Sequence, residues 1–321
     1  MKILVAGGAG YIGSHTCKAL SQAGHMPIVL DNLCQGKRDF VRWGELVVGD
    51  ISDSDLLDKI FQENRIDAVI HFAAYAYVGE SVVEPGKYYR NNVCATLCLL
   101  DSMIHNKVNK IVFSSSCATY GIPQRVPILE QDFQNPINPY GNTKLIVEKI
   151  LKDYDKAYNF KSICLRYFNA AGCDPDGQIG EMHDPEPHVI PCMLKAASGE
   201  TQSFSIYGND YDTPDGTCIR DFIHVNDLAE AHVAALNRLE NNSSSDSFNL
   251  GTGNGYSIRK ILEIVREITS RNFSLEIKNR RLGDPPVLIA DGGKARMELG
   301  WNPKYSIEDI VQTAWKWHMK K

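Results

Sequence analysis

Through the first half of the chain, short hydrophobic runs alternate with amphipathic stretches, and this alternation leaves few folds open. The runs are nearly continuous and rich in β-branched residues, as expected for parallel strands that helices cover on both faces. Between them, apolar residues recur at helical spacing, for example at Val93, Leu97, Leu100 and Ile104. The pattern predicts an α/β fold with a Rossmann-type doubly wound parallel sheet. The six predicted strands are Lys2–Ala6, Pro27–Leu30, Glu45–Val48, Ala68–Phe72, Lys110–Ser114 and Ser162–Tyr167.

The second half of the chain has a different character. From Asn169 to about Asp221 it is rich in Gly, Pro and Asp, which predicts a loop-rich region. We expect a sheet domain in residues 1–168 and, in 169–321, mainly a smaller α/β domain, with 222–250 returning to the first. Further helices are predicted over Leu228–Leu239, Ile258–Ile268 and Ile307–Trp317, and a strand over Phe248–Leu250.

Charge and cysteine usage narrow the class of protein. Lys and Arg total 34 against 39 Asp and Glu, a formal charge of −5, which disfavours a nucleic-acid partner. No run approaches the ~20 apolar residues of a membrane helix, and the N-terminus resembles a strand rather than a signal peptide. The 9 cysteines form no Cys-x-x-Cys pair and the histidines are dispersed, so we expect a cytoplasmic protein without a metal.

Three glycines, Gly7, Gly10 and Gly13, follow the first predicted strand at Gly-x-x-Gly-x-x-Gly spacing. Where a strand turns into a helix, such positions let a pyrophosphate approach the backbone N–H groups, although the spacing also suits a purely structural turn. Asp31 ends the second strand, where a carboxylate binds the ribose hydroxyls and favours NAD over NADP; a turn residue is the alternative. Asp50, after the third strand, is positioned to face the adenine.

A serine, a tyrosine and a lysine form the candidate catalytic group. Ser116 follows the fifth predicted strand, and Tyr140 and Lys144 lie four residues apart, on one face of a predicted helix. A tyrosine, with a pKa near ~10, becomes a base when positive charge stabilises its phenolate, and we expect Lys144 to contribute such charge. A Tyr-x-x-x-Lys pair alone usually packs on a helix surface; the glycine turn and the serines favour a reaction centre at the carboxyl edge of the sheet.

These motifs resemble those of the extended short-chain dehydrogenase/reductases, and within them the UDP-glucose (UDP-galactose) 4-epimerases. The resemblance covers nearly the whole chain, and its early motifs are shared by many relatives. The later strings, above all Tyr207-Gly-Asn-Asp-Tyr211 and Ile219-Arg-Asp-Phe-Ile-His-Val225, are far more specific. Other matching strings are Asp31-Asn-Leu-Cys34, His71-Phe-Ala-Ala74, Tyr89-Arg-Asn-Asn-Val93, Pro139-Tyr-Gly141, Leu165-Arg-Tyr-Phe-Asn169 and Asp215-Gly-Thr217.

The resemblance implies a site that binds NAD beside a UDP-hexose. Beyond the three glycines, the implied cofactor-binding residues are Tyr11, Ile12, Asp31, Asn32, Asp50, Ile51, Phe72, Ala73, Asn92, Ser116, Tyr140, Lys144 and Phe168. The implied substrate-binding residues are Ser116, Tyr140, Asn169, His188, Val189, Tyr207, Arg220, Arg281, Asp284 and Leu288. The arginines suit a diphosphate, since a planar guanidinium donates paired hydrogen bonds.

Two positions depart from the family pattern. His188 stands where many members have an asparagine, so its substrate contact is open and a loop histidine is the alternative. Leu288 stands where a tyrosine often narrows the sugar pocket. The shorter leucine predicts room for a 2-acetamido group, and hence turnover of UDP-N-acetylglucosamine and UDP-N-acetylgalactosamine, unless Leu288 packs in the core or neighbours refill the space.

The implied activity is inversion of the C4 hydroxyl of UDP-glucose and UDP-galactose, with bound NAD and no net redox change. Tyr140 would move the O4 proton, Ser116 would bind the oxygen and Lys144 would hold the nicotinamide ribose. A 4,6-dehydratase would need a carboxylate after Ser116, where this chain has Cys117-Ala118. A 4-epimerase of a UDP-uronate or UDP-pentose and a non-catalytic NAD-dependent regulatory protein remain as alternatives. The family also suggests a homodimer, through helices such as Asn92–His105 and Tyr140–Tyr154.

Overall fold

A computed structural model describes residues 1–241, 244–281 and 284–320. Its main sheet has seven strands, all parallel, in the order β3-β2-β1-β4-β5-β6-β10. All six strands predicted in the first half are present, and the largest difference is at β5, which runs two residues further and includes Ser116. The strands are β1 (Lys2–Ala6), β2 (Met26–Asp31), β3 (Glu45–Val48), β4 (Ala68–His71), β5 (Lys110–Ser116), β6 (Lys161–Tyr167) and β10 (Asp246–Leu250).

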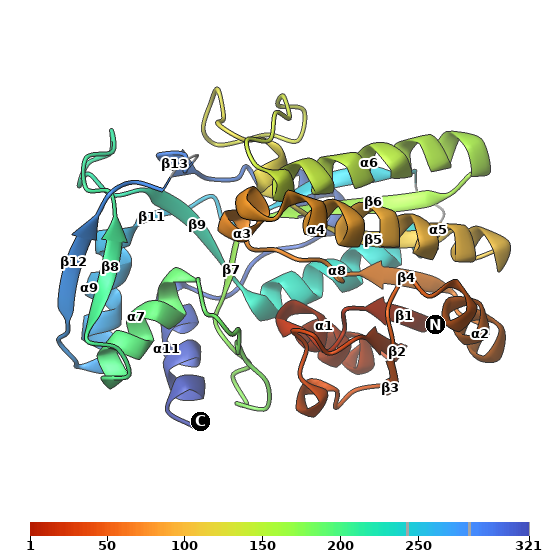
Figure 1. Cartoon of the computed structure of the whole chain (residues 1–321), viewed down its shortest axis with the longest axis horizontal. Helices are drawn as coiled ribbons and strands as arrows, with labels where there is room; N and C mark the ends of the chain where they lie inside the picture. Colours follow the sequence, from red (N-terminus) through yellow and green to blue (C-terminus); the bar gives the residue numbers. More distant parts are fainter. Residues whose placement is uncertain (242–243, 282–283, 321) are drawn as a thin grey trace.

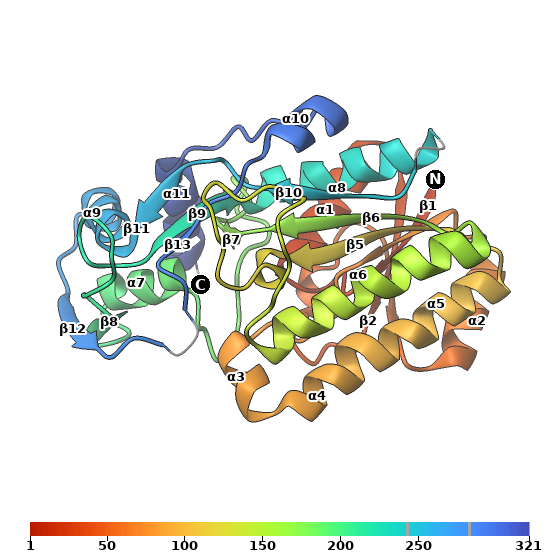
Figure 2. The ribbon, with the colours of Figure 1, turned by 90° about the horizontal axis from the view of Figure 1, so that it is seen from above.

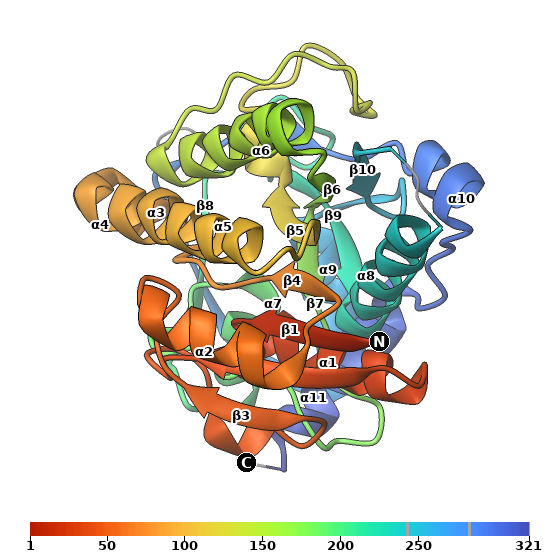
Figure 3. The same ribbon diagram turned by 90° about the vertical axis from the view of Figure 1, so that its right-hand side faces the viewer.

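Helices cover both faces of this sheet, so the predicted fold class is confirmed (Figure 3). Helices α1 and α8 pack on one face and contribute buried Leu20 and Leu228 to its core. On the opposite face, α2, α5 and α6 bury Leu57, Leu99 and Leu151. Their bounds are α1 (Tyr11–Gln22), α2 (Ser54–Asn64), α5 (Ala95–His105), α6 (Pro139–Tyr158) and α8 (Val225–Glu240). Two short helices, α3 (Val78–Val83) and α4 (Pro85–Tyr89), and a π-helical turn over Arg90–Cys94 precede α5.

The start of α6 shows how local sequence places a site residue. Asn138 is the N-cap, and its side chain accepts a hydrogen bond from the Gly141 backbone N–H at 2.8 Å. Pro139 follows at the first helical position, where its missing N–H has no cost. Tyr140 therefore lies in the first turn of a long helix, with Lys144 one turn further along.

Most of the remaining elements form a smaller layered part beside the carboxyl edge of the sheet, at the left of Figure 1, whereas α10 (Gly293–Leu299) packs against α8 and β10 of the main sheet. Strand β9 is central there, with β7, β11 and β13 as its neighbours, and β8 pairs with β12. Helices α7, α9 and α11 enclose a third hydrophobic core. The bounds are β7 (Asn169–Ala171), α7 (Val189–Ser198), β8 (Ser203–Tyr207), β9 (Ile219–His224), β11 (Gly255–Ser257), α9 (Ile258–Thr269), β12 (Ser274–Lys278), β13 (Val287–Leu288), α10 (Gly293–Leu299) and α11 (Ile307–His318).

The stretch from Asn169 to Asp221 is more regular than its composition predicts. It contains helix α7, strands β7 and β8, and the first half of β9. Ile190, Met193 and Leu194 have helical spacing and are fully buried, a short stripe that the neighbouring prolines obscure in the sequence. Burial of apolar side chains in the third core, rather than local propensity, determines the secondary structure of this region.

The chain passes between the two parts more than once, as the view from above shows (Figure 2). It leaves the main sheet at the end of β6, forms β7 after Phe168 alone, and returns through β9 into α8 and then β10. These crossings bring loops of the smaller part against the carboxyl ends of the strands. No helix in the described ranges is both long and apolar enough to span a membrane.

Candidate active site

A cavity of about 1520 Å³ lies between the two parts of the molecule. The carboxyl ends of β1, β2, β3 and β5 reach it from one side, and α7, β8, β9 and β13 from the other. Ligands of doubly wound sheets bind at this edge. All but two of the sequence-predicted site residues line the cavity; of the described residues, Asn92 and Lys144 lie behind its wall.

The glycine turn closes one end of the cavity. Gly7 has φ +82°, and a Cβ there would lie 2.6 Å from the Ala73 backbone nitrogen. A Cβ on Gly13 would lie 2.3 Å from the Gly7 carbonyl oxygen, so both positions require glycine. Gly10 is the N-cap of α1 and has no side chain to cap it, and no side chain in Tyr11–Ser14 is acidic. The helix N-terminus is thus open to an anion, and the turn fits a pyrophosphate.

Asp31, at the end of β2, has both a structural and a binding position. One carboxylate oxygen accepts a hydrogen bond from the Ala9 backbone at 2.9 Å and the other from Leu33 at 2.8 Å. Burial raises the Asp31 pKa, and these two bonds work against the shift. The carboxylate therefore fixes the glycine turn while it lines the cavity, where it would meet ribose hydroxyls. The turn role of Asp31 is thus confirmed, and its contact with the ribose remains a prediction.

Asn32 and Asp50 form a polar corner beside Asp31. The Asn32 amide donates to the Asp50 carboxylate at 2.7 Å, and the Ser52 hydroxyl donates to its other oxygen at 2.7 Å. Burial alone would raise the Asp50 pKa, but the bonds from Ser52 and Asn32 outweigh it and lower the pKa. Asp50 is thus kept ionised on the cavity wall.

Ser116, Tyr140 and Lys144 come together where β5 ends and α6 begins. Ser116 and Tyr140 line the cavity, and the Ser116 hydroxyl is a hydrogen-bond partner of Tyr140. The Lys144 ammonium is buried behind them; it donates to the Ser114 carbonyl at 2.7 Å and lies 5.9 Å from the centre of the Tyr140 ring. The three side chains meet as their spacing suggests, with Lys144 behind the cavity wall, and its contact with the nicotinamide ribose remains a prediction.

The electrostatics at Tyr140 differ from the expectation that Lys144 lowers its pKa. Burial raises the pKa of Tyr140 well above its ordinary value, the Tyr167 phenol raises it further, and the Ser116 hydroxyl offsets only part of the shift. Burial also lowers the pKa of Lys144 to about 7, against the opposing charge of Glu148. A lysine that is only partly charged at neutral pH, and whose Nζ is directed at Ser114, stabilises the phenolate little.

Asn92, for which a cofactor contact remains a prediction, holds the cavity wall in place. Its side-chain oxygen accepts from the Tyr75 backbone N–H at 2.9 Å, and its amide donates to the Tyr75 carbonyl at 2.9 Å. The same amide donates to the Thr143 hydroxyl at 3.1 Å. Asn92 therefore joins the loop after β4 to α6, one residue before Lys144. These bonds give Asn92 a positioning role in the protein itself.

The opposite wall carries the two arginines. Arg220, on β9, forms an ion pair with Asp284 and donates to the Pro285 carbonyl at 2.8 Å. The Arg281 guanidinium stacks 4.1 Å from the centre of the Tyr207 ring. All five of these residues line the cavity. Arg280, which precedes Arg281 in the sequence, does not line it and pairs with Asp210 at 2.7 Å. Of the two adjacent arginines, Arg281 is the one directed at the site.

The remaining predicted residues also reach the cavity, each in a particular setting. Leu288, on β13, lines it and also packs against the main core, so neither of its two readings excludes the other. His188 is the N-cap of α7, and its Nδ1 faces Glu186 at 2.7 Å. The other predicted residues on the wall are Tyr11, Ile12, Ile51, Phe72, Ala73, Phe168, Asn169 and Val189.

Several lining residues are absent from the predicted set. Tyr167 bonds the Ser114 hydroxyl at 2.5 Å and influences Tyr140, and its position within Leu165-Arg-Tyr-Phe-Asn169 is the signal that could have found it. Tyr77, Glu181 and His183 also line the cavity. For the last two, the signal is the spacing Glu-x-His in the loop before α7.

Comparison with known proteins agrees with this geometry. The profile of the NAD dependent epimerase/dehydratase family matches residues 3–251. A UDP-glucose 4-epimerase of Halalkalibacterium halodurans is 52% identical over 319 residues, which is 99% of this chain and 96% of that protein. The resemblance found in the sequence is confirmed.

Solved structures give the same result. The crystal structure of UDP-glucose 4-epimerase from Brucella ovis in complex with NAD matches with a TM-score of 0.96 and 51% identity, covering 98% of this chain and 97% of that one. The UDP-Glc/GlcNAc 4-epimerase from Campylobacter jejuni matches with a TM-score of 0.87 and 41% identity, covering 100% and 99%.

Proposed function

The chain belongs to the NAD dependent epimerase/dehydratase family, and from this premise we propose that it interconverts UDP-glucose and UDP-galactose by inverting the configuration at C4. It is an NAD-dependent enzyme, and its relatives with this activity match it over almost the whole chain. The observation that carries the proposal is a single cavity: the glycine turn, the Ser116–Tyr140 pair and the arginine wall all open into it.

The proposed chemistry assigns a proton to Tyr140. As the phenolate, Tyr140 takes the proton from the sugar O4; as the resulting phenol, it returns that proton to the same oxygen once the sugar presents its opposite face, while the Ser116 hydroxyl hydrogen-bonds this oxygen. NAD, when bound, supplies the acceptor and donor of the C4 hydrogen. Because burial keeps the Tyr140 phenol protonated, its ionisation requires added positive charge at this end of the cavity. The buried Lys144, bonded to Ser114, holds the end of β5 that presents Ser116.

The UDP part of the substrate is proposed to bind on the arginine wall. Arg281, stacked on Tyr207, keeps its N–H groups for phosphate oxygens, and Arg220 adds a second positive charge that Asp284 orients. Asn169, His188 and Val189 complete the proposed substrate contacts. Anchoring the nucleotide on this wall leaves the sugar free to present either face to Tyr140.

A wider substrate range is a second proposal, and it depends on Leu288. This side chain lines the cavity, and a structural relative at 41% identity is described as a UDP-Glc/GlcNAc 4-epimerase. Leucine leaves more room than a tyrosine and presents no hydroxyl. We therefore propose that N-acetylated UDP-hexoses are also turned over.

The remaining proposals concern organisation. We propose that residues 1–168 with 222–250 form the NAD-binding unit and that 169–321 otherwise form the UDP-sugar unit, since the glycine turn and the arginine wall lie on these two parts. A homodimer through α5 and α6, which run side by side on the outside of the sheet, is proposed from the family (Figure 2). A cytoplasmic location is proposed from the nine cysteines, which are scattered and form no Cys-x-x-Cys pair.

The proposal is tested by incubating the purified protein with UDP-galactose and separating the products. We expect conversion to an equilibrium mixture with UDP-glucose, without external oxidant, and about one NAD released per chain on denaturation. Uronic and pentose UDP-sugars form the comparison panel. Bound NAD without conversion of any sugar nucleotide would favour a regulatory protein and overturn the proposal.

A further inference from the structure

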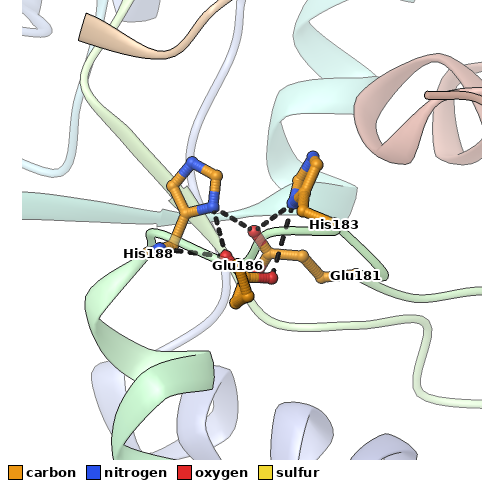
Figure 4. A group of neighbouring side chains, drawn as sticks. All are labelled: Glu181, His183, Glu186 and His188. Carbon is orange, nitrogen blue, oxygen red and sulfur yellow. Dashed lines mark hydrogen bonds and ion pairs between the residues drawn. The ribbon is translucent and has the colours of Figure 1, made fainter. Parts of the chain in front are cut away.

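Four side chains with metal-binding groups meet beside the cavity, within the loop that precedes α7. They are Glu181, His183, Glu186 and His188, and Figure 4 shows each imidazole directed at carboxylate oxygens. Each offers one ligand atom, and these four atoms all lie within 4.8 Å of one another. The group spans only eight residues, so loop geometry alone brings it together.

The distances suit a tetrahedral ion. The His188 Nδ1 lies 2.9 Å from a Glu181 oxygen and 2.7 Å from a Glu186 oxygen. The His183 Nδ1 lies 3.1 Å from Glu181 and 3.5 Å from Glu186. Two ligands of a tetrahedral zinc, each ~2.0–2.1 Å from the ion, are about 3.3 Å apart. The two separations to the shared Glu181 Oε1, 2.9 and 3.1 Å, are close to that value, whereas Glu186 presents Oε1 to His188 and Oε2 to His183.

The group buries two carboxylates beside two imidazoles, and a cation could replace the protons on the imidazoles. The Glu181 and Glu186 side chains are only 5% and 3% exposed, and a buried carboxylate needs a positive partner. Two imidazolium ions would supply it, but the two rings lie only 4.9 Å apart and would repel each other. A divalent ion balances both carboxylates and leaves both imidazoles neutral, which removes this repulsion.

Neighbouring groups hold the four side chains in place. The His188 backbone N–H donates to Glu186 at 2.9 Å, and the Cys192 thiol donates to the Glu186 carbonyl at 3.3 Å. The Tyr11 ring packs edge-on against His183, with centroids 6.0 Å apart. Such supporting contacts orient ligands at metal sites.

We propose that Glu181, His183, Glu186 and His188 bind one divalent transition-metal ion, of which Zn²⁺ is the reference. With four protein ligands the ion has a structural role. It fixes the loop that links β7 to α7 against Tyr11 at the start of α1, and so joins the two walls of the cavity. The four residues line the cavity of the proposed epimerase, and His188 is also a proposed substrate contact, so metal binding is tested by readouts other than turnover.

The test uses the full-length protein after dialysis against a chelator. Titration with Co²⁺ is expected to give the visible absorption of a tetrahedral site at one equivalent, and Zn²⁺ is expected to displace it with the same stoichiometry. Calorimetry with Zn²⁺ gives the affinity. These readouts do not depend on turnover, so failure of the metal site and failure of the epimerase proposal are distinguishable.

His183→Ala and His188→Gln supply the variants, with His105→Ala, an exposed histidine on α5, as the matched control. Loss of a ligand should weaken Zn²⁺ binding by more than the about 10–100-fold that loss of a supporting partner costs, while the control binds as wild type. Circular dichroism verifies folding. Absence of Co²⁺ absorption and Zn²⁺ heat in the wild type, or unchanged affinity in both folded variants, would leave only a His–Glu ion-pair network and overturn the proposal.

Discussion

The two walls of the cavity differ in the atoms that form their surfaces. On the cofactor wall, backbone atoms form the surface: Gly7 and Gly13 have no space for a Cβ, and Asp31 is held by backbone N–H groups. On the substrate wall, side chains such as Arg281 and Leu288 project from short strands and loops. A wall of backbone tolerates no added atom, whereas a wall of side chains can change one contact at a time. We therefore expect the cofactor wall to keep the reaction the same and the substrate wall to determine which sugar nucleotide is accepted.

Tyr140 lies between the walls, and its loss should have the largest effect. Tyr140→Phe keeps the packing of the ring but removes the group that moves the O4 proton, so kcat should fall by about 10²- to 10⁴-fold. Bound NAD should stay at the wild-type level. Tyr154→Phe is the matched control, because Tyr154 lies on the same helix and its hydroxyl donates a hydrogen bond to the Asp101 carboxylate. Near-normal kcat in Tyr140→Phe would remove this residue from the chemistry.

The backbone wall is probed by Gly7→Ala against Gly24→Ala. Both glycines have positive φ, +82° and +81°, so alanine at either carries a similar strain of about 1–3 kcal/mol. Only Gly7 also faces a clash, with Ala73 at 2.6 Å, because nothing lies within 4 Å of a Cβ at Gly24. Urea unfolding and assays of bound NAD should show a larger loss of stability, and loss of NAD, in Gly7→Ala alone. Equal behaviour of the two variants would refute the close-approach argument.

The substrate wall is probed by Arg281→Lys against Arg280→Lys. Lysine keeps the charge but loses the paired hydrogen bonds, and a hydrogen bond to a charged group contributes about 1.5–3 kcal/mol, or roughly 10–100-fold in KM. We expect this rise for UDP-galactose in Arg281→Lys, with kcat nearly unchanged. Arg280 pairs with Asp210, so its variant should keep a normal KM. If the two variants exchange these results, the wall has been assigned to the wrong arginine.

A smaller change should separate the substrates. Leu288→Tyr narrows the sugar pocket, so kcat/KM for UDP-N-acetylglucosamine should fall about 10-fold or more relative to UDP-galactose. Leu288→Met, of similar volume, should leave the ratio unchanged. The two kcat/KM values are measured side by side. Absence of any turnover of the acetylated sugar by the wild type would end this proposal.

The buried Lys144, behind the cavity wall, predicts how the stability of the protein depends on pH. Its pKa is lowered by burial to about 7 in the folded protein, whereas 10.5 is ordinary. Between these values the unfolded chain binds the proton and the folded protein does not, so stability rises with pH, by at most ~1.4 kcal/mol per unit. The free energy of unfolding of the wild type, measured with urea relative to that of Lys144→Met, should therefore rise from pH 7 to pH 9. A flat difference would mean that the lysine is charged when buried.

The contrast between the walls also explains what could be predicted from sequence. Gly7, Asp31, Ser116 and Tyr140 were all placed correctly on the sheet edge because each lies at the end of a strand or the start of a helix. Hydrophobic periodicity and turn residues are local features of the sequence, so they can be interpreted without knowledge of the tertiary fold. The substrate wall depends on strands as short as β13, which only its pairing with β9 creates. Its residues could be named only through the family resemblance.

Burial is what the sequence could not show. Spacing places Lys144 one turn from Tyr140, but spacing does not show that the ammonium is buried, bonded to Ser114 and partly discharged. In the same way, the amide of Asn92 is taken up by Tyr75. The Glu-x-His-x-x-Glu-x-His pattern was present in the sequence, but only the folded loop shows its side chains converging.

The most direct test of the whole account follows the hydrogen at C4. UDP-galactose deuterated at C4 is incubated with the enzyme in ordinary water, and the UDP-glucose formed is analysed by NMR. If both walls enclose one reaction in a single cavity, the deuterium stays at C4 of the product. Its replacement by solvent hydrogen would contradict the account.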